Sequence, residues 1–327
     1  MKNILLTGGF GYIGSRFLEE YRYAYSFHVI DNQFFDNKNE LYNINNTIKD
    51  IRDIEISDLH DVDYVIHLSE LSNDPLGEVN ENLTYSINHE GTKNLLNLCN
   101  LANIEKFIYM SSCAVYGKNK NLVTESSKVN PLTTYSKSKI LNEEYIINND
   151  FNFETIILRN ATVFGYSKNL RLDLVINELV YEALYNSCII LNSDGTPLRP
   201  FVHVGDLVRI INLLVNSNNL LDKQIINIGS KNLNYSIKEI ALNIADKLDI
   251  KDIKYGEKDP DQRSYKVNFS KFENLFPEYN FNFDLDKGID ELIKNYKEHN
   301  FDLNVYRLKK IKYLLDENII DEKLKFI

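Results

Sequence analysis

A glycine-rich stretch near the start of the chain places the tightest limit on its fold. Thr7-Gly8-Gly9-Phe10-Gly11-Tyr12-Ile13-Gly14 directly follows the short apolar run Asn3–Thr7 and opens an amphipathic stretch that continues to Tyr21. An apolar run, then glycines, then helical periodicity is typical of a strand that turns sharply into a helix. In such a turn one glycine permits the tight bend, another lets the backbone approach a bound group, and a third lets helix and strand pack closely. We therefore expect the chain to begin with the first part of a βαβ unit.

The first half of the chain continues to alternate short apolar runs with amphipathic stretches. The candidate strands are Asn3–Thr7, Phe27–Ile30, Thr47–Lys49, Tyr64–Leu68, Lys106–Met110 and Thr155–Leu158. The candidate helices lie near Gly14–Tyr21, Asn82–Leu101 and Thr134–Asn148, and in the second of these Leu95, Leu98 and Leu101 have helical spacing. Runs of this kind are expected of buried parallel strands joined by helices. The fold class is therefore predicted to be α/β, with a doubly wound parallel sheet of the Rossmann type.

The rhythm of the sequence changes from about Ala161, where loops marked by proline and glycine separate smaller elements. We expect there a helix near Leu207–Val215, a strand at Gln224–Ile228 and a helix to about Leu248. The last of these has Ser236 as its N-cap, with Glu239 three residues on. A mostly helical tail follows from about residue 284. A chain of 327 residues is long enough for about two domains, so we expect a first lobe of residues 1–160 and a smaller α/β lobe of residues 161–327, whose helical C-terminal extension has no assignable role.

Composition and charge exclude several classes of partner. Lys and Arg number 37 against 47 Asp and Glu, a net charge of −10, which disfavours nonspecific binding to nucleic acid or to an anionic membrane. No apolar run approaches the roughly 18–20 residues of a membrane span. The three cysteines, Cys99, Cys113 and Cys188, are far apart and have no metal-binding spacing. We therefore expect a cytoplasmic protein with no metal and with neither a nucleic-acid nor a membrane partner.

The position of the glycine-rich turn also indicates what it binds. Exposed N–H groups and the positive end of the following helix hold a pyrophosphate without any lysine. Asp31 ends the second strand at about the distance expected for a residue that accepts hydrogen bonds from a ribose, and it favours NAD over NADP because it would repel a 2′-phosphate. The alternatives are a plain glycine turn and a solvated carboxylate at a strand end. The residues predicted to bind NAD here are Gly8, Gly11, Tyr12, Ile13, Gly14, Asp31 and Asn32.

A tyrosine and a lysine four residues apart are the candidate catalytic pair. Tyr135 and Lys139 lie in one predicted helix, on the same face. A nearby ammonium stabilises a phenolate, so the tyrosine becomes usable as a proton acceptor from a sugar hydroxyl during hydride transfer. Ser112, after the preceding strand, would hydrogen-bond the same substrate oxygen. The alternative is an ordinary amphipathic helix with a lysine that extends its charged end into solvent.

Five motifs together resemble those of one enzyme family. They are Thr7–Gly14, Asp50-Ile51-Arg52-Asp53, Asn88-His89-Glu90-Gly91-Thr92, Ser111-Ser112-Cys113-Ala114-Val115-Tyr116-Gly117 and Tyr135–Lys139. They look like the extended short-chain dehydrogenases/reductases, and within these like the NAD-dependent nucleotide-sugar epimerases and dehydratases. The resemblance covers most of residues 1–275.

The resemblance implies further roles, each with a plainer alternative. Asp50 and Ile51 would contact the adenine, and Leu68 and Ser69 would line the path of the adenosine and pyrophosphate. Asn88 would support the cofactor region. Lys139 would also bind the nicotinamide ribose. A nucleotide-diphosphate sugar would be held by Asn73, Asp74, Ser112, Asp173, Asn177, Arg199 and Arg263, the two arginines meeting the diphosphate. Asp50 is alternatively a loop carboxylate, Asn88 a helix cap, and each arginine half of a surface salt bridge. The helices around residues 88–101 and 135–149 resemble those that form a four-helix interface in homodimers of this family.

Departures from the family pattern narrow the reaction. The 4,6-dehydratases carry an Asp-Glu pair where this chain has Cys113-Ala114, so elimination of water is not expected. Cys113 is either an added acid/base group or a buried small hydrophobe, and we expect His203 to be structural. The predicted function is that of a nucleotide-sugar 4-epimerase. The first alternative is a 4-dehydrogenase that releases a 4-keto hexose or heptose for a downstream enzyme, and the second is a sensor that binds dinucleotide without turnover.

Overall fold

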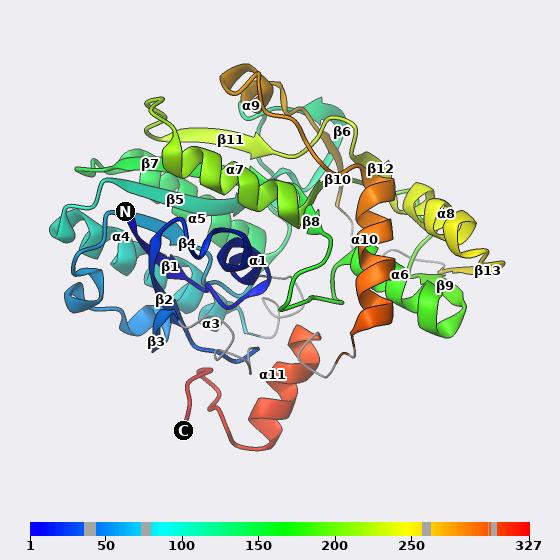
Figure 1. Cartoon of the computed structure of the whole chain (residues 1–327), viewed down its shortest axis with the longest axis horizontal. Helices are drawn as coiled ribbons and strands as arrows, with labels where there is room; N and C mark the ends of the chain where they lie inside the picture. Colours follow the sequence, from blue (N-terminus) through cyan, green and yellow to red (C-terminus); the bar gives the residue numbers. More distant parts are fainter. Residues whose placement is uncertain (36–43, 73–79, 257–262, 300, 302–305) are drawn as a thin grey trace.

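Seven parallel strands form the central sheet of the computed structural model, which describes residues 1–35, 44–72, 80–256, 263–299, 301 and 306–327 (Figure 1). The strands are β1 (Asn3–Thr7), β2 (Ser26–Asp31), β3 (Asn45–Ile48), β4 (Tyr64–His67), β5 (Lys106–Ser112), β7 (Glu154–Asn160) and β11 (Gln224–Ile228). Their order is β11-β7-β5-β4-β1-β2-β3, with every neighbouring pair parallel. The order reverses between β1 and β4, and ligands of such sheets bind at the carboxyl ends of the strands beside this point. The predicted fold class is confirmed.

Helices cover both faces of this sheet. The elements on or near it are α1 (Tyr12–Tyr21), α3 (Glu81–Tyr85), α4 (Gly91–Ala102), α5 (Thr134–Asn148), α7 (Val204–Asn216) and the short α9 (Ser270–Leu275). Phe17 of α1 and Leu207 of α7 share one buried cluster with β1, whereas Leu95 of α4 and Ile146 of α5 belong to the cluster on the opposite face. The doubly wound arrangement follows from these two apolar layers.

The helix expected near Asn82–Leu101 is interrupted. A π-helical segment at Ser86–Glu90 separates α3 from α4, and its extra residue re-aims the side chains on either side of it. Of the three leucines with helical spacing, Leu95 is fully buried but Leu101 is 70% exposed. Steps of three residues drift around a helix that has 3.6 residues per turn, which carries Leu101 off the buried face.

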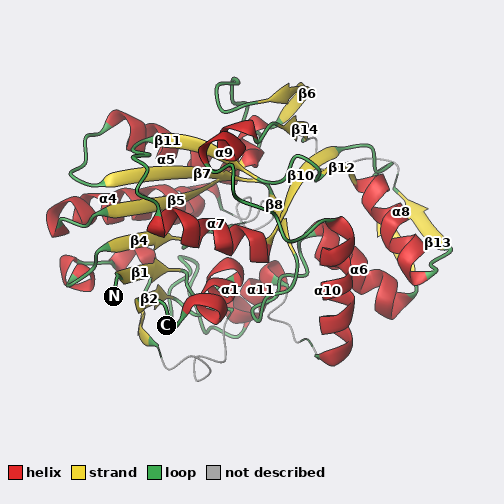
Figure 2. Ribbon diagram, turned by 45° about the horizontal axis from the view of Figure 1, so that its top comes forward, coloured by secondary structure: helices red, strands yellow, loops and turns green. Residues whose placement is uncertain are grey.

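A second lobe lies at one end of the molecule (Figure 2). Its strands are β8 (Thr162–Phe164), β10 (Leu198–His203) and β12 (Asn234–Ser236) in one sheet, and β9 (Cys188–Leu191) paired with β13 (Asp252–Tyr255). Its helices are α6 (Val175–Asn186), α8 (Ile237–Leu248) and α10 (Leu285–Glu298), which share a third apolar cluster. The predicted capping box of α8 is present, because Ser236 accepts from the backbone of Glu239 and the Glu239 side chain accepts from Ser236. Strands β6 (Lys118–Val123) and β14 (Ser264–Val267) pair beside the lobe junction.

Parts of the chain after residue 160 pack on the first lobe. Strand β11 pairs with β7 at the edge of the large sheet, and α7 packs on α1. The last helix, α11 (Arg307–Asp316), and the segment after it also return to the first lobe, where Ile311 and Leu324 join the cluster that holds α4. The physical reason is that an apolar strand and an apolar helix face bury most surface against the open sheet edge and the uncovered sheet face.

Candidate active site

One large cavity lies at the carboxyl ends of β1, β4 and β5. Its volume is about 1120 Å³, and it extends from the glycine-rich turn past Tyr135 to Arg199 and Arg263 of the second lobe. Single small-molecule pockets are commonly about 300–1,000 Å³, so the cavity has room for more than one small ligand.

The glycine-rich turn forms one wall of the cavity as the sequence predicts. Gly8 has a φ of +67°, and a Cβ atom on Gly14 would lie 2.4 Å from the carbonyl oxygen of Gly9. Neither position accepts a side chain, the first because of its left-handed backbone and the second because α1 packs tightly on the turn. A Cβ on Gly11 would meet Gly8 O at 3.1 Å and would otherwise occupy open space in the cavity wall. The exposed backbone at the start of α1 therefore fits a pyrophosphate.

Asp31 lies beside this turn at the end of β2. Its carboxylate accepts hydrogen bonds from the backbone N–H of Phe10 at 3.0 Å and of Gln33 at 2.8 Å. Asp31 and Asn32 both line the cavity. The carboxylate is thus held in place between the turn and the end of the strand, where a ribose hydroxyl would meet it.

The expected adenine contacts lie at the same end. Asp50 and Ile51 line the cavity, and Asp50 forms a two-pronged ion pair with Arg52, at 2.8 and 2.6 Å. Leu68 and Ser69 line the cavity after β4. All four residues therefore surround the space next to the glycine-rich turn.

Asn88 is fully buried outside the cavity, in the π-helical segment. Its Oδ1 accepts from Leu71 N at 2.8 Å, while its Nδ2 donates to Leu71 O at 3.2 Å and to Ser138 Oγ at 3.3 Å. Asn88 therefore fastens the loop after β4 to helix α5, an arrangement that supports the cofactor region indirectly.

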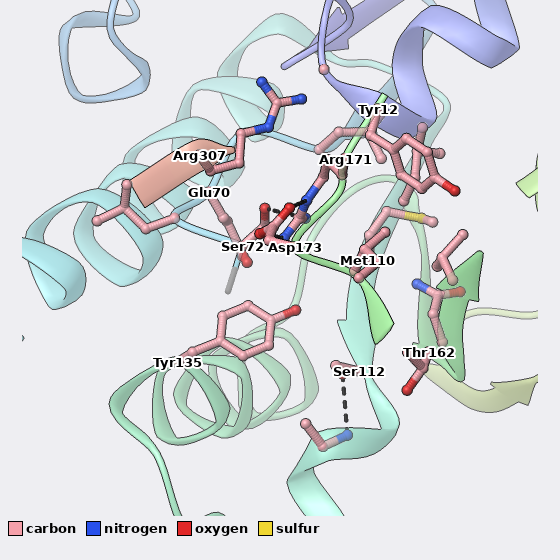
Figure 3. Close-up of a pocket in the computed structure, with 18 of the residues that line it drawn as sticks. Tyr12, Glu70, Ser72, Met110, Ser112, Tyr135, Thr162, Arg171, Asp173 and Arg307 are labelled. Carbon is pink, nitrogen blue, oxygen red and sulfur yellow. Dashed lines mark hydrogen bonds and ion pairs between the residues drawn. The ribbon is translucent and has the colours of Figure 1, made fainter. Parts of the chain in front are cut away.

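Tyr135, Lys139 and Ser112 are brought together in the middle of the cavity. Thr133 caps α5 by accepting from Ser136 N at 3.2 Å, which starts the helix one residue before Tyr135. The Lys139 ammonium lies 5.3 Å from the centroid of the Tyr135 ring and donates to Met110 O. In Figure 3 the Tyr135 ring projects from α5, and its hydroxyl faces the space bordered by Met110 and Ser112.

Sequence reasoning missed Glu70, which forms an ion pair with Lys139. Its other carboxylate oxygen accepts from Tyr109 OH at 2.9 Å, and Tyr109 in turn accepts from Asn142 Nδ2 at 2.8 Å. Burial works against the charge of Lys139, but Glu70, Tyr135 and Glu143 together outweigh it and raise the pKa of Lys139. Burial raises the pKa of Glu70 as well, against the opposing effect of the lysine. The available signal was the position of Glu70 three residues after the end of β4, because that strand end faces the ligand site.

The substrate side of the cavity contains most of the residues expected there. Arg199, Arg263 and Asp173 line it, and the Arg199 guanidinium lies 5.7 Å from the centroid of the Tyr265 ring while donating to backbone oxygens of Leu198 and Arg263. Asn73 and Asp74 lie outside the described residues.

Asn177 differs from its expected role. It is fully buried, accepts from Gly165 N at 3.0 Å and donates to Arg171 O at 2.9 Å. It does not line the cavity, because α6 turns it toward the backbone of the preceding loop. The structure therefore shows it fastening the cavity wall.

Arg171 is a cavity residue that the sequence reading did not single out. Its guanidinium pairs with Asp173 at 3.1 and 2.7 Å and donates to Ser72 Oγ at 3.0 Å. Figure 3 shows this group above Tyr135. The spacing of an arginine and an aspartate two residues apart was the only local signal.

The C-terminal segment, residues 306–327, closes the cavity beside Asp50 and Ile51. Arg307 and Leu324 line the cavity. The Arg307 guanidinium donates to Asn169 Oδ1 at 3.0 Å, and Asn169 donates to Phe10 O of the glycine-rich turn. No local sequence pattern predicts that this segment lies beside Asp50, because the two are about 270 residues apart in the chain.

Cys113 and His203 lie away from the reacting groups. Cys113 is buried, donates to Arg159 O at 3.1 Å, and burial raises the pKa of its thiol. His203 is fully buried, contacts Glu291 at 2.8 Å and stacks on Phe283. Neither lines the cavity. Among the described residues, no group of His, Cys, Asp and Glu could hold a metal ion, and no described helix is long and apolar enough to cross a membrane.

Comparisons with known proteins agree with this geometry. The model of the NAD-dependent epimerase/dehydratase family matches residues 4–229. A putative UDP-glucose 4-epimerase of Methanocaldococcus jannaschii is 34% identical over 240 residues, which are 69% of this chain and 76% of that protein.

Two solved structures share the fold. A UDP-N-acetylglucosamine 4-epimerase of Methanobrevibacter ruminantium superposes with a TM-score of 0.80 at 24% identity, covering 91% of this chain and 98% of that one. A UDP-glucuronic acid 4-epimerase of Bacillus cereus superposes with a TM-score of 0.81 at 24% identity, covering 90% and 99%.

Proposed function

The chain belongs to the NAD-dependent epimerase/dehydratase family, and from that premise we propose that it is a nucleotide-sugar 4-epimerase. The observation that carries the proposal is that Tyr135, Lys139 and Ser112 line the same cavity as the glycine-rich turn and Asp31. The glycine-rich turn and Asp31 would hold NAD, which would supply the hydride acceptor and donor for C4 of the sugar.

The residues of the chain divide the remaining work. Tyr135 takes the proton of the C4 hydroxyl, Ser112 hydrogen-bonds the same oxygen, and Lys139 stabilises the phenolate and binds the nicotinamide ribose. Arg199 and Arg263 bind the diphosphate of the substrate, because guanidinium groups match phosphate oxygens.

Residues 113 and 114 argue against elimination of water. Ala114 has no titratable group, and burial raises the pKa of the Cys113 thiol. Cys113 lies outside the cavity wall, so it has no path to a sugar carbon. The pair therefore supplies neither an acid nor a base for a dehydratase step.

The C-terminal segment favours epimerisation over release of a 4-keto sugar. Returning the hydride requires that the reduced cofactor stay bound while the sugar turns over. Residues 306–327 pack across the end of the cavity where we place the adenosine, through Arg307 and Leu324. A dehydrogenase that exchanges its cofactor each cycle would have to move this segment each time.

A nucleotide-sugar panel with deuterium at C4 tests the proposal. NMR of the products of a 4-epimerase shows the inverted sugar with the deuterium still at C4, because the hydride returns to the carbon it left. A 4-dehydrogenase gives a ketone at C4 and loses the label to the cofactor. If neither the inverted sugar nor the ketone forms from any UDP-, GDP-, CDP- or dTDP-sugar, the result would contradict the proposed 4-epimerase activity.

We also propose that the chain forms a homodimer through α4 and α5. The two helices lie side by side, joined by the hydrogen bond from Tyr145 OH to Asn97 Oδ1 at 2.8 Å. They expose Leu101, Leu141 and Ile147, which are 70%, 37% and 40% accessible. A four-helix interface would bury these side chains. Sedimentation equilibrium should give the mass of two chains, and the mass of one chain would contradict the proposal.

A further inference from the structure

Glu70 places a buried negative charge beside the catalytic lysine. Both side chains are almost completely buried, with 4% of Glu70 and 5% of Lys139 accessible. Both carboxylate oxygens are engaged, one by the ammonium and the other by Tyr109 OH, which donates to it. Both donors stabilise the ionised form of this carboxyl, whereas burial opposes that form. The site therefore contains a charged pair, not a lone lysine.

The partners of this pair fix its position from several elements. Lys139 of α5 also donates to Met110 O of β5, so the ammonium is held between that strand and the loop after β4. Asn142, one turn further along α5, donates to Tyr109 OH at 2.8 Å and to Asn88 O at 2.7 Å. Rotation of Lys139 toward or away from Tyr135 would break its contacts to both the loop after β4 and β5.

We propose that Glu70 is a positioning residue of this site, whose carboxylate holds Lys139 in place and sets the pH range in which Tyr135 gives up its proton. The inference rests on the proposed role of Tyr135 as the base. The two charges act on the phenol with opposite signs, because the ammonium favours the phenolate and the carboxylate disfavours it.

Other titratable groups face the pair and bear on the same equilibrium. From β4, His67 lies near Lys139, and burial lowers its pKa to about 3, so it is neutral across the working range. From β5, burial raises the pKa of Tyr109 well above its usual value. From α5, Glu143 adds to the charge acting on Lys139 but is itself paired with Arg159 at 2.6 Å. None of these groups changes its charge in the pH range in which Tyr135 is expected to lose its proton.

A third charged pair faces the phenol from the second lobe. Arg171 interacts with Tyr135 and is paired with Asp173 at 2.7 Å. Arg171 and Asp173 carry opposite charges, so the field of the pair at the phenol is smaller than that of an unpaired ion. Glu70 is the carboxylate paired with the lysine whose ammonium lies 5.3 Å from the centroid of the Tyr135 ring.

The direction in which the pKa of Tyr135 shifts on replacing Glu70 follows from the charges of the Glu70 carboxylate and the Lys139 ammonium. Replacing Glu70 by glutamine removes an anion. The phenolate of Tyr135 is then less strongly opposed, so the pKa of Tyr135 falls. The ammonium of Lys139 loses its counter-ion in a buried place, so the pKa of Lys139 falls too. The whole pH profile of the site moves to lower pH.

Tyrosinate absorbance measures this shift without any substrate. The NAD-saturated wild-type protein and its Tyr135→Phe variant are titrated with base, and their difference isolates the Tyr135 phenol. The same pair of proteins is then prepared with Glu70→Gln. We expect the Tyr135 midpoint to fall by about 1 pH unit, since a neighbouring charge shifts a pKa by about 1–3. Glu291→Gln is the matched control, because Glu291 is also ion-paired but lies with His203, outside the cavity.

An unchanged midpoint in folded Glu70→Gln protein would overturn the inference, as would an equal shift in Glu291→Gln. If Glu70→Gln does not fold, Glu70→Asp is used instead. Aspartate keeps the negative charge but has a side chain one methylene shorter, so the carboxylate lies farther from Lys139. The midpoint of the Tyr135 titration should then shift in the same direction but by less. An unchanged midpoint in that variant would also overturn the inference. Because the titration uses no nucleotide sugar, a missing product in the substrate panel would count against the proposed function alone.

Discussion

The guanidinium of Arg307 lies 4.1 Å from the centroid of the Phe35 ring. The contact joins the last helix of the chain to the loop after β2, and both residues line the cavity. Leu324 and Phe326 extend the same contact, the latter with its ring 5.1 Å from that of Phe34. The C-terminal segment is therefore part of the cofactor-binding lobe.

Arg307→Ala should weaken the retention of NAD. The substitution removes a cation–π contact and a hydrogen bond to Asn169, together worth about 1–2 kcal/mol, or roughly a tenfold rise in the dissociation constant. The NAD content of the purified protein and the rate of exchange with labelled NAD measure the change. Lys312→Ala is the matched control on the exposed side of the same helix. Equal retention in both variants would show that the segment does not hold the cofactor.

Asp31→Asn should reduce the preference for NAD over NADP. The carboxylate accepts ribose hydroxyls and repels a 2′-phosphate, and its loss removes both effects. A charge-assisted hydrogen bond contributes about 1.5–3 kcal/mol, so we expect NAD to bind at least about tenfold more weakly, with NADP binding weakened less or improved. Calorimetric titration with each dinucleotide measures the ratio. A ratio that stays the same would mean that Asp31 is only a strand-end carboxylate.

Lys139→Met should destabilise the fold in a pH-dependent way. The substitution leaves the Glu70 carboxylate buried without its counter-ion, and breaking a buried pair in this manner costs about 3–5 kcal/mol. Burial raises the pKa of Glu70, so in the folded variant this carboxyl takes up a proton at a higher pH than in the unfolded chain. The deficit is therefore full at neutral pH and shrinks as the pH falls.

Urea unfolding at several pH values measures that deficit. The double variant Lys139→Met with Glu70→Gln removes both charges and should recover much of the lost free energy of unfolding. A deficit that is the same at every pH, and that the second substitution leaves untouched, would rule out the buried ion pair as its source.

Arg263→Ala should raise KM for the nucleotide sugar about tenfold and leave kcat within about twofold, because a contact to the diphosphate is made equally before and during the reaction. Lys266→Ala is the matched control, since this exposed lysine lies on β14, three residues after Arg263, but does not line the cavity. A comparable change in both variants would point to general electrostatic attraction in place of a specific contact.

The sequence predicted those parts of the fold that local patterns determine. The six strands expected in the first half all occur in the central sheet, and five of them are short apolar runs; the edge strand β3 is mostly polar and exposed. The start of α5 was also predictable, because its cap and the Tyr135 motif are contiguous. The packing of β11 and α7 on the first lobe was not predictable, because the sequence of an apolar run does not indicate which of two sheets the run joins.

The site shows the same division between local and distant information. The glycine-rich turn, Asp31 and Tyr135 were identified from short motifs and line one cavity. Glu70 was missed, because its importance depends on Lys139, which lies on another element far along the chain. Arg307 was missed for the same reason, and Asn177 was assigned to the substrate although its helix turns it into the protein.

The most direct test of the central claim is the single-turnover absorbance of reduced nicotinamide in the Tyr135→Phe variant. Wild-type protein saturated with NAD and mixed with its nucleotide sugar should show transient reduction of the cofactor. Loss of a general base lowers such a rate by about 10²–10⁴-fold, so we expect the variant to bind both ligands with nearly unchanged affinity and to reduce its cofactor slower by that factor. Reduction at the wild-type rate in the variant would contradict the account.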